Sequence, residues 1–228
     1  MEIKQLFDAE TCTYSYLLIN VVSQEAAIID PVKEQFQRDK RYIQELGLTL
    51  KYSIETHIHA DHVTASGFMR NELGAMTVVH KNSGSSCPDI LVEDGAEFSL
   101  GDETIKVIYT PGHTDTCISL YIDGHVFTGD TLLIRACGRT DFQAGSSAML
   151  FDSITQKLFT LPDNTIVHPG HDYEGFSSTT IGEEKKLNPR LGGDMPKAEF
   201  VQIMDSMDLP DPKHMAVAVP GNLACGLN

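Results

Sequence analysis

The sequence has no long apolar run and no linker. No window approaches the roughly 18 apolar residues that a membrane span needs. The N-terminus, residues 1–5, lacks the basic-then-apolar order of a signal peptide, so we expect the mature chain to begin here without export. No segment rich in proline, glycine or serine separates two halves of the 228 residues. We therefore expect one domain, residues 1–228, with a short C-terminal helical extension.

Positive charge is scarce as well. The 17 Lys and Arg residues are outnumbered by 32 Asp and Glu residues, which gives a formal net charge of −15. This excess repels phosphate backbones and anionic membranes, so nucleic acid and membranes are poor candidate partners. The sequence does not determine the oligomeric state, and a homodimer is one option.

Paired cysteine motifs are also missing. The five cysteines are odd in number, are scattered along the chain and form no CxxC pair. This usage predicts a reduced, cytoplasmic compartment, and we expect most of these side chains to be small core residues. The five are Cys12, Cys87, Cys117, Cys137 and Cys225.

The apolar pattern predicts a mixture of strands and helices. Three short apolar bursts within residues 2–30 are typical of antiparallel strands, and residues 81–95 are expected to form a loop. The rest of the chain alternates between apolar spacings typical of strands and apolar spacings typical of helices. This alternation suits two sheets packed face to face with helices on the outside. We expect strands at 48–54, 76–79, 97–100, 104–109, 117–122, 125–127 and 165–167, helices at 32–46, 63–73, 146–161, 177–187 and 197–207, and a Pro-rich tail.

Four metal-capable side chains fall within six residues, directly after the apolar run 52–54. In an extended segment residues i and i+2 point to the same side, so His57 and His59 can face one point. The turn that follows brings Asp61 and His62 beside them. A lone histidine is more often structural, but polar groups crowded in this way need partners, and a divalent cation is the common one. The segment 56–62 is therefore predicted to be a metal-ligand cluster.

Three later strand ends carry further ligand types. His113 and His171 each follow a Pro-Gly pair, which lets the backbone turn closely, and Asp130 follows a glycine. The polar loop 134–142 comes soon after Asp130 and is expected to border the pocket. His125 lies away from these loops and is interpreted as structural.

These motifs together resemble the metallo-β-lactamase superfamily. The resemblance rests on the segment 57–62 and on the glycine-ligand pairs that end at 113, 130 and 171, and it spans nearly the whole chain. It implies the four-layer αββα sandwich, with the ligands along a shared edge. Within the superfamily, the segments 56–62, 111–114, 133–142, 168–173 and 187–190 are similar to the persulfide dioxygenases, and glyoxalase II is the near relative.

The resemblance to persulfide dioxygenases implies one Fe²⁺ per chain on His57, His113 and Asp130. Two histidines and one carboxylate leave open positions for O₂ and a sulfur substrate. The implied activity is the oxidation of glutathione persulfide with O₂ and water to sulfite and glutathione. The remaining candidate metal ligands would orient the iron ligands or hold a second metal. These residues are His59, Asp61, His62 and His171.

All seven ligands of a dinuclear site are present, so the residues alone leave one metal or two open. Two Zn²⁺ would make a thioester hydrolase of the glyoxalase II type, in which a bridging hydroxide attacks a carbonyl. The loop 135–142 favours the dioxygenase. So does the short segment 172–228, because glyoxalase II usually has a long helical C-terminal domain. A metal- or sulfide-responsive binding protein is a third option of lower weight.

The same resemblance implies three substrate contacts. Arg139 would hold a glutathione carboxylate by a bidentate pair, and a structural ion pair with Asp141 is the alternative. Tyr173 would contact the tripeptide or the persulfide sulfur. Cys225 matches a family position near the substrate, and a plain core cysteine is an equal alternative.

Overall fold

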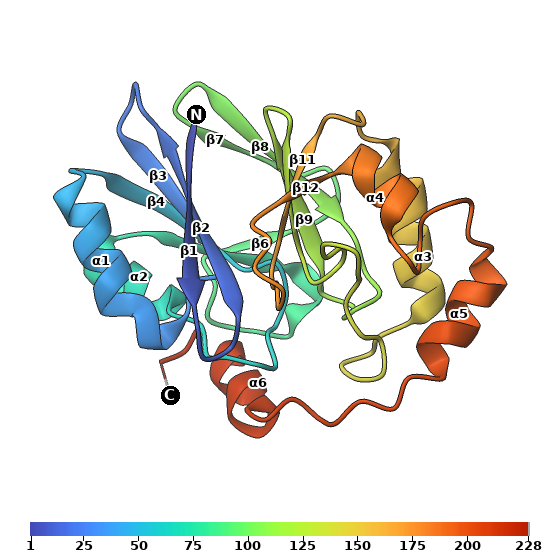
Figure 1. Ribbon diagram of the computed structural model, residues 1–228. Helices are drawn as coiled ribbons and strands as arrows, with labels where there is room; N and C mark the ends of the chain where they lie inside the picture. Colours follow the sequence, from blue (N-terminus) through green and yellow to red (C-terminus); the bar gives the residue numbers. More distant parts are fainter. Residues whose placement is uncertain (228) are drawn as a thin grey trace. The chain divides into compact units, whose positions relative to one another are not determined.

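The chain forms two compact units in the computed structural model, which describes residues 1–227 (Figure 1). The first unit contains Met1–Val92, Glu97–Ile105 and Asp211–Asn228. The second contains Glu93–Ala96 and Lys106–Pro210. The organisation as a single domain stays a prediction beside this division, and each unit is described by itself.

The first unit is built on a six-stranded sheet in which the strands follow their order in the sequence. The first three strands pair antiparallel, as the three apolar bursts predict, and the next three are parallel. Every residue of the second strand is buried, which explains its nearly continuous run of large side chains. The strands are β1 (Glu2–Asp8), β2 (Thr13–Asn20), β3 (Glu25–Ile29), β4 (Thr49–Ile54), β5 (Met76–His80) and β6 (Ile90–Val92).

Two helices flank this sheet. Helix α1 (Phe36–Glu45) follows the short 3₁₀ turn η1 (Lys33–Gln35) and buries Phe36 and Ile43. Helix α2 (Ser66–Leu73) ends at Gly74, whose φ of 74° is the left-handed conformation that closes many helices. It starts later than predicted, because the residues before Ser66 complete the loop that leaves β4.

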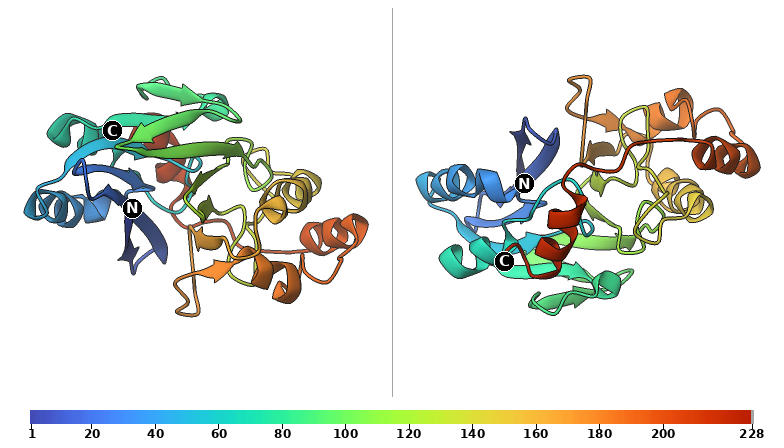
Figure 2. Two further views of the ribbon diagram at one scale, coloured as in Figure 1. Left: turned by 90° about the horizontal axis from the view of Figure 1, so that it is seen from above. Right: turned by 90° about the horizontal axis from the view of Figure 1, so that it is seen from below.

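Two elements of this unit were missed by the sequence analysis. Strand β6 lies in the expected loop 81–95, and helix α6 (Met215–Leu223) lies in the expected Pro-rich tail. A proline inside a helix removes one backbone donor, so Pro220 hides the helical signal. Helix α6 belongs to the first unit although it follows the second in the sequence (red in Figures 1 and 2).

The second sheet is mixed, with the order β12-β11-β10-β9-β8-β7. Strands β8, β9 and β10 pair antiparallel, β10 and β11 pair parallel, and β12 is antiparallel to β11. The boundary between the units falls inside β8. These strands are β7 (Glu97–Leu100), β8 (Glu103–Tyr109), β9 (Ile118–Ile122), β10 (His125–Gly129), β11 (Ile166–Pro169) and β12 (Thr179–Thr180).

Three helices complete the second unit: α3 (Ser147–Gln156), α4 (Ile181–Leu187) and α5 (Lys197–Asp205). The side chain of Ser146 caps α3 by accepting a hydrogen bond from the backbone of Met149. The helix is shorter than predicted, since its last turn becomes the 3₁₀ turn η3 (Leu158–Thr160). The core under these helices includes Leu150, Ile154, Leu158, Val167, Ile181 and Phe200, all fully buried.

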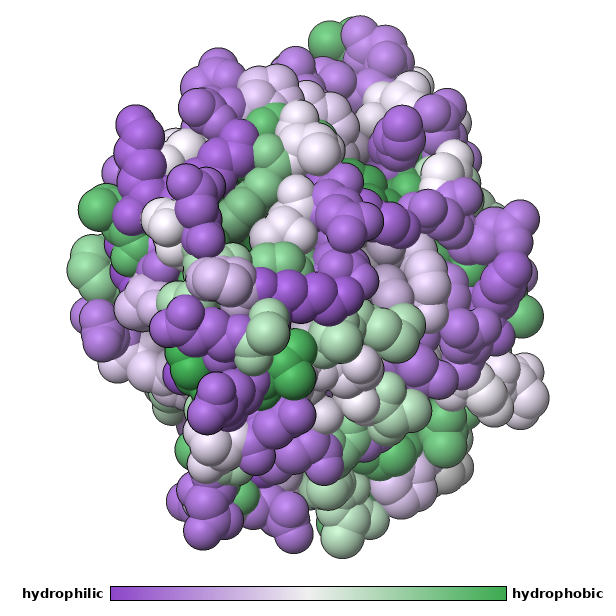
Figure 3. All heavy atoms as spheres, turned by 90° about the vertical axis from the view of Figure 1, so that its right-hand side faces the viewer, coloured by the Kyte–Doolittle hydropathy of each residue, from purple (hydrophilic) through white to green (hydrophobic). Residues whose placement is uncertain are grey.

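The face in Figure 3 is dominated by hydrophilic side chains, and apolar ones are dispersed among them. This distribution agrees with the acidic composition of the chain. None of the helices within residues 1–227 combines the length and the apolar character that crossing a membrane requires.

A partly buried histidine pair lies between β10 and β11. The ring of His168 stacks on Phe127 with centroids 4.6 Å apart, and its Nε2 lies 3.0 Å from Nδ1 of His125. Burial lowers the pKa of His168 to about 4, with the charge of His125 as a smaller cause. This pair agrees with the structural role expected for His125.

We predict that His168 makes the chain less stable in acid. The unfolded chain binds a proton at His168 near the ordinary pKa of 6.5, whereas the folded chain binds it only near pH 4. Stability is therefore lost as the pH falls from 6.5 to 4, by about 3 kcal/mol at most at ~1.4 kcal/mol per pKa unit. Urea unfolding of the wild type and of His168→Phe across this range should show a shallower loss in the variant. Equal slopes would contradict the assignment.

Candidate metal centre

The loop after β4 gathers three buried histidines in the first unit. The ring centroids of His57 and His59 are 4.1 Å apart, and those of His59 and His62 are 4.3 Å apart. All three side chains are buried, and Asp61 beside them is partly exposed. The structure therefore brings together the four ligand candidates that the motif predicts.

His57 is oriented by a relay that begins at Asp30. The Asp30 carboxylate accepts the backbone N–H of Thr56 at 2.7 Å and its hydroxyl at 2.7 Å. Because the hydroxyl proton is directed to Asp30, the Thr56 oxygen, 3.0 Å from His57 Nδ1, accepts from that nitrogen. The Nε2 atom of His57 then carries the lone pair that a metal would use.

His59 lies between two buried carboxylates. Its Nε2 is 3.1 Å from Asp30 Oδ1 and 3.3 Å from Glu55 Oε2. Burial alone would lower the pKa of His59, but the Asp30 and Glu55 carboxylates raise it well above 6.5. With Nε2 directed to these acids, Nδ1 is the atom left for a metal, and it is buried without a hydrogen bond to the described residues.

His62 is held in a similar way by its neighbour. Its Nδ1 lies 2.8 Å from Asp61 Oδ2, which also accepts from the Thr13 hydroxyl at 3.1 Å. The Nε2 atom is buried, and no hydrogen bond reaches it from residues 1–227. A cavity of about 230 Å³ lined by Asp8, Glu10 and Asp61 lies beside His62. His59, Asp61 and His62 place ligand atoms within 4.8 Å of one another, which suits a metal ion.

The second unit places its candidates around one carboxylate. Asp130 directly follows β10, with Oδ2 3.6 Å from His113 Nε2 and Oδ1 3.6 Å from His171 Nε2. These separations are too long for hydrogen bonds but suit ligands around a cation, since each ligand lies about 2.0–2.2 Å from the ion. Asp130 Oδ1 is buried and has no hydrogen bond within the described part of the chain. The donors of each unit therefore fit a metal.

His113 has a fixed tautomer. Its Nδ1 lies 2.7 Å from the carbonyl oxygen of Arg139, and a carbonyl can only accept. His113 therefore carries its proton on Nδ1 and presents the lone pair of Nε2 toward Asp130. Gly112 makes this turn possible, because its φ of 145° is rarely adopted by residues with a side chain.

Arg139 forms the ion pair that was weighed as the alternative to a substrate contact. Its Nε and Nη2 atoms donate to the Asp141 carboxylate at 2.7 and 2.6 Å. Nη1 and Nη2 also donate to the carbonyl oxygens of Pro210 at 2.6 Å and Leu209 at 3.1 Å. The guanidinium thus joins its own loop to the segment after α5, and its contact with a substrate stays a prediction.

The other two predicted substrate contacts differ in exposure. Tyr173 is 72% exposed, and its ring lies parallel to that of His171 with centroids 5.9 Å apart. Cys225 is 3% exposed and forms a disulfide with Cys87. The reduced state that the cysteine usage predicts does not hold for this pair. The two cysteines are 138 residues apart in the sequence, so no local cysteine spacing could indicate this disulfide. Cys117 and Cys137 are buried thiols, as predicted.

Three residues that support the loop 56–62 are revealed only by the structure, and they are Asp30, Glu55 and Asn222. Asn222 in α6 donates to the carbonyl oxygens of His59 and His62 at 2.9 Å each and accepts from the Thr64 N–H at 2.7 Å. The buried strand-end acid before Pro31 was the only signal available.

We predict that Gly170→Ala weakens metal binding while the fold is retained. A Cβ at this position would lie 2.5 Å from Asp130 Oδ1, the far end of a side chain that can move aside. The carboxylate should then leave its place between His113 and His171, and metal affinity should fall roughly 10–100-fold, as it does when a ligand loses its support. Metal analysis together with circular dichroism tests this. Normal metal content in the folded variant would contradict it.

Residues 12–171 match the model of the metallo-beta-lactamase superfamily. Two curated relatives carry the name persulfide dioxygenase ETHE1, mitochondrial. The protein of Bos taurus is 45% identical over 99% of this chain and 89% of its own length. The protein of Homo sapiens is 44% identical over the same shares.

Two solved structures are similar along the whole chain. ETHE1 from Myxococcus xanthus has a TM-score of 0.96 and 49% identity, and covers 99% of this chain and 100% of its own. A metallo-beta-lactamase from Staphylococcus aureus has a TM-score of 0.91 and 27% identity, and covers 100% of this chain and 73% of its own. The predicted fold class is confirmed: two mixed sheets with flanking helices. The chain therefore belongs to the metallo-beta-lactamase superfamily and, within it, to the persulfide dioxygenases.

Proposed function

We propose that this chain is an iron-dependent persulfide dioxygenase. It oxidises glutathione persulfide with O₂ and water to sulfite and glutathione. The observation that carries the proposal is 45% identity to a persulfide dioxygenase over 99% of this chain and 89% of the relative. Glutathione persulfide and O₂ are the proposed partners, and the cytoplasm and a homodimer stay predictions.

The proposed cofactor is one Fe²⁺ per chain, held by His57, His113 and Asp130. Ferrous iron with two histidines and one carboxylate keeps open positions at which O₂ and an anionic sulfur can react. The hydrogen bonds within each unit support this ligand set, since Thr56 and the Arg139 carbonyl each direct the proton of one histidine to Nδ1. Each Nε2 is then ready to bind without a further loss of a proton.

The balanced reaction requires the chain to manage protons and water. Both oxygen atoms of O₂ pass to the terminal sulfur of the persulfide, and water cleaves the sulfur–sulfur bond to release sulfite and glutathione. His59, Asp61, His62 and His171 are proposed to orient the ligands and to hydrogen-bond the water that the last step consumes. The Asp30 and Glu55 carboxylates raise the pKa of His59 well above 6.5.

Arg139 and Tyr173 are the proposed contacts for the tripeptide. A guanidinium paired with Asp141 is already ordered, so an incoming carboxylate meets a fixed donor group. The exposed ring of Tyr173, parallel to His171, offers an apolar face to the substrate. Cys225 is proposed to lie near the substrate, as the family resemblance implies. Its sulfur forms a disulfide with Cys87 and is not a free thiol.

The second candidate is a zinc-dependent thioester hydrolase with two metals. One observation favours it: His59 Nδ1 and His62 Nε2 are both buried without hydrogen bonds to the described residues, and such atoms suit a second ion. Two Zn²⁺ per chain, no O₂ uptake and thioester cleavage would establish this activity in place of the dioxygenase.

Metal analysis of protein purified under nitrogen tests the iron site, together with O₂ uptake and sulfite release on glutathione persulfide. We expect about one iron per chain in the wild type. Asp130→Ala should lose the iron, because it removes the only carboxylate of the proposed set. Asp123→Ala changes an acid in the turn before β10 and should keep the iron. An iron-loaded, active Asp130→Ala variant would refute the ligand assignment.

Arg139→Ala separates a substrate contact from a structural role. We expect the KM for glutathione persulfide to rise roughly tenfold or more, since a charge-assisted hydrogen bond contributes about 1.5–3 kcal/mol. Iron content should change far less. Asp141→Asn is the matched second variant, because it weakens the pair that orders the guanidinium and keeps the guanidinium itself, so it should raise the KM less than Arg139→Ala does. Loss of iron from Arg139→Ala with an unchanged KM would assign the residue to the loop alone.

A further inference from the structure

The C-terminal helix α6 holds the metal-ligand loop through one side chain. Asn222 is 5% exposed and uses both of its N–H groups on the carbonyl oxygens of His59 and His62. Its own carbonyl oxygen accepts the N–H of Thr64. One asparagine therefore fixes three backbone groups of the loop that contains the predicted ligands, and it arrives from a segment about 160 residues later.

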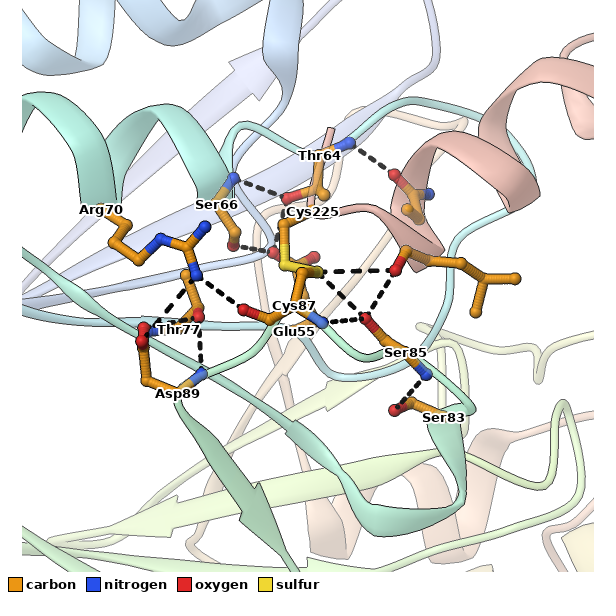
Figure 4. The surroundings of a disulfide bond; sticks show 12 residues. Glu55, Thr64, Ser66, Arg70, Thr77, Ser83, Ser85, Cys87, Asp89 and Cys225 are labelled. Carbon is orange, nitrogen blue, oxygen red and sulfur yellow. Dashed lines mark hydrogen bonds and ion pairs between the residues drawn. A yellow bond between two sulfur atoms is a disulfide. The ribbon is translucent and has the colours of Figure 1, made fainter. Parts of the chain in front are cut away.

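The other end of the same segment is covalently attached. Cys225, just after α6, is bonded to Cys87, which lies in the loop before β6 (Figure 4). The Ser85 hydroxyl donates to the carbonyl oxygen of Leu223 at 2.7 Å, and Arg70 donates to the carbonyl oxygen of Cys87 at 2.6 Å. The disulfide thus joins the end of α6 to a loop that is itself held by α2.

The backbone between these two points is packed closely. The N–H of Gly67 donates to the carbonyl oxygen of Cys225 at 2.9 Å, and a Cβ on Gly67 would lie 2.6 Å from that oxygen. Gly226 has a φ of 74°, and a Cβ there would lie 1.9 Å from the Thr64 carbonyl oxygen. A small displacement of Cys225 is therefore transmitted to Thr64, which Asn222 also contacts.

A second link joins Thr64 to the histidines. The Thr64 hydroxyl donates to Glu55 Oε1 at 2.6 Å (Figure 4). The other oxygen of Glu55 lies 3.3 Å from His59 Nε2. The disulfide, Asn222, Thr64 and His59 thus form one connected set of contacts inside the first unit. Opening the disulfide would therefore weaken the contacts that hold His59.

We propose that Asn222 is the positioning residue of the loop 56–64, and that the Cys87–Cys225 disulfide locks it in place until a small thiol opens the disulfide. The regulatory meaning rests on the proposed function, in which the substrate is a persulfide and the product is a thiol. The mechanical part concerns the chain alone, so it can fail or hold independently of the activity.

The chemistry of opening is ordinary thiol–disulfide exchange. A thiolate such as glutathione attacks the half-buried sulfur of Cys87, forms a mixed disulfide and releases Cys225 as a thiolate that takes up a proton. A second thiolate attacks the mixed disulfide, which yields oxidised glutathione and the Cys87 thiol. Two thiols are oxidised and one disulfide is reduced, so the electrons balance.

Amide hydrogen exchange of the metal-free protein tests the lock directly. We expect three free thiols in the oxidised protein, Cys12, Cys117 and Cys137. On reduction by glutathione, exchange at the Thr64 amide should speed up by about tenfold or more, because local opening becomes easier, and reoxidation should reverse the change. In Cys87→Ser, the Thr64 amide should exchange as fast as in the reduced protein, and glutathione should not change that rate. Cys12→Ser is the matched control and should respond as the wild type does.

Asn222→Ala separates positioning from simple stabilisation. In the oxidised protein it should speed exchange at Thr64 and shift the visible absorption spectrum of the Co²⁺-loaded protein, because the ligand geometry changes. Asn164→Ala, at an exposed asparagine of the second unit, should do neither. The proposal is overturned by five free thiols in the air-purified protein, by equal Thr64 exchange before and after reduction, or by an unchanged Co²⁺ spectrum in Asn222→Ala. None of these readouts requires dioxygenase activity.

Discussion

The carboxylate of Asp30 is the interaction on which the histidine loop 56–62 depends. It lies at the end of β3, buried, and it binds the N–H and the hydroxyl of Thr56 while it also contacts His59. A buried carboxylate is costly unless such donors surround it, so the loop must fold around it. Through Thr56 it also determines which nitrogen of His57 is available to a metal. One acid therefore holds the backbone at Thr56, sets the tautomer of His57 and contributes to the raised pKa of His59.

Asp130 has the corresponding place in the second unit, but it is arranged in the opposite way. Asp30 is saturated with hydrogen-bond donors, whereas Asp130 keeps a buried oxygen without one among the described residues and lies between two histidine nitrogens. The difference agrees with Asp30 as a supporting acid and with the proposal of Asp130 as a ligand. A supporting acid is stabilised by protein donors, and a ligand must leave its lone pairs to the ion. Gly170 makes this possible, because a side chain there would occupy the place of the carboxylate oxygen.

The acidic composition also has a functional consequence. A net charge of −15 does not attract an anionic substrate over a distance, so the proposed recognition of glutathione persulfide relies on local cations such as Arg139. The Arg139 guanidinium is held by Asp141 and by two carbonyl oxygens. The backbone carbonyl oxygen of Arg139 orients His113. In the proposed function, one loop therefore carries the substrate contact through the Arg139 side chain and supports the ligand His113 through the Arg139 backbone.

The sequence by itself determined the candidate ligands and the strand ends that carry them, because both follow from local spacing, and the resemblance of its motifs to the superfamily implied the fold class. His57 and His59 on one extended segment, and a histidine after each Pro-Gly turn, need no distant information to be found. Only the tertiary structure decided which partner each group has. Thr56 directs His57, the Arg139 carbonyl directs His113, Asp141 pairs with Arg139, and Asn222 holds the loop from a helix that Pro220 concealed. Cys87 and Cys225 are 138 residues apart, and no spacing rule reaches that far. Hydrogen bonds and disulfides depend on distances in space, which only the folded chain sets.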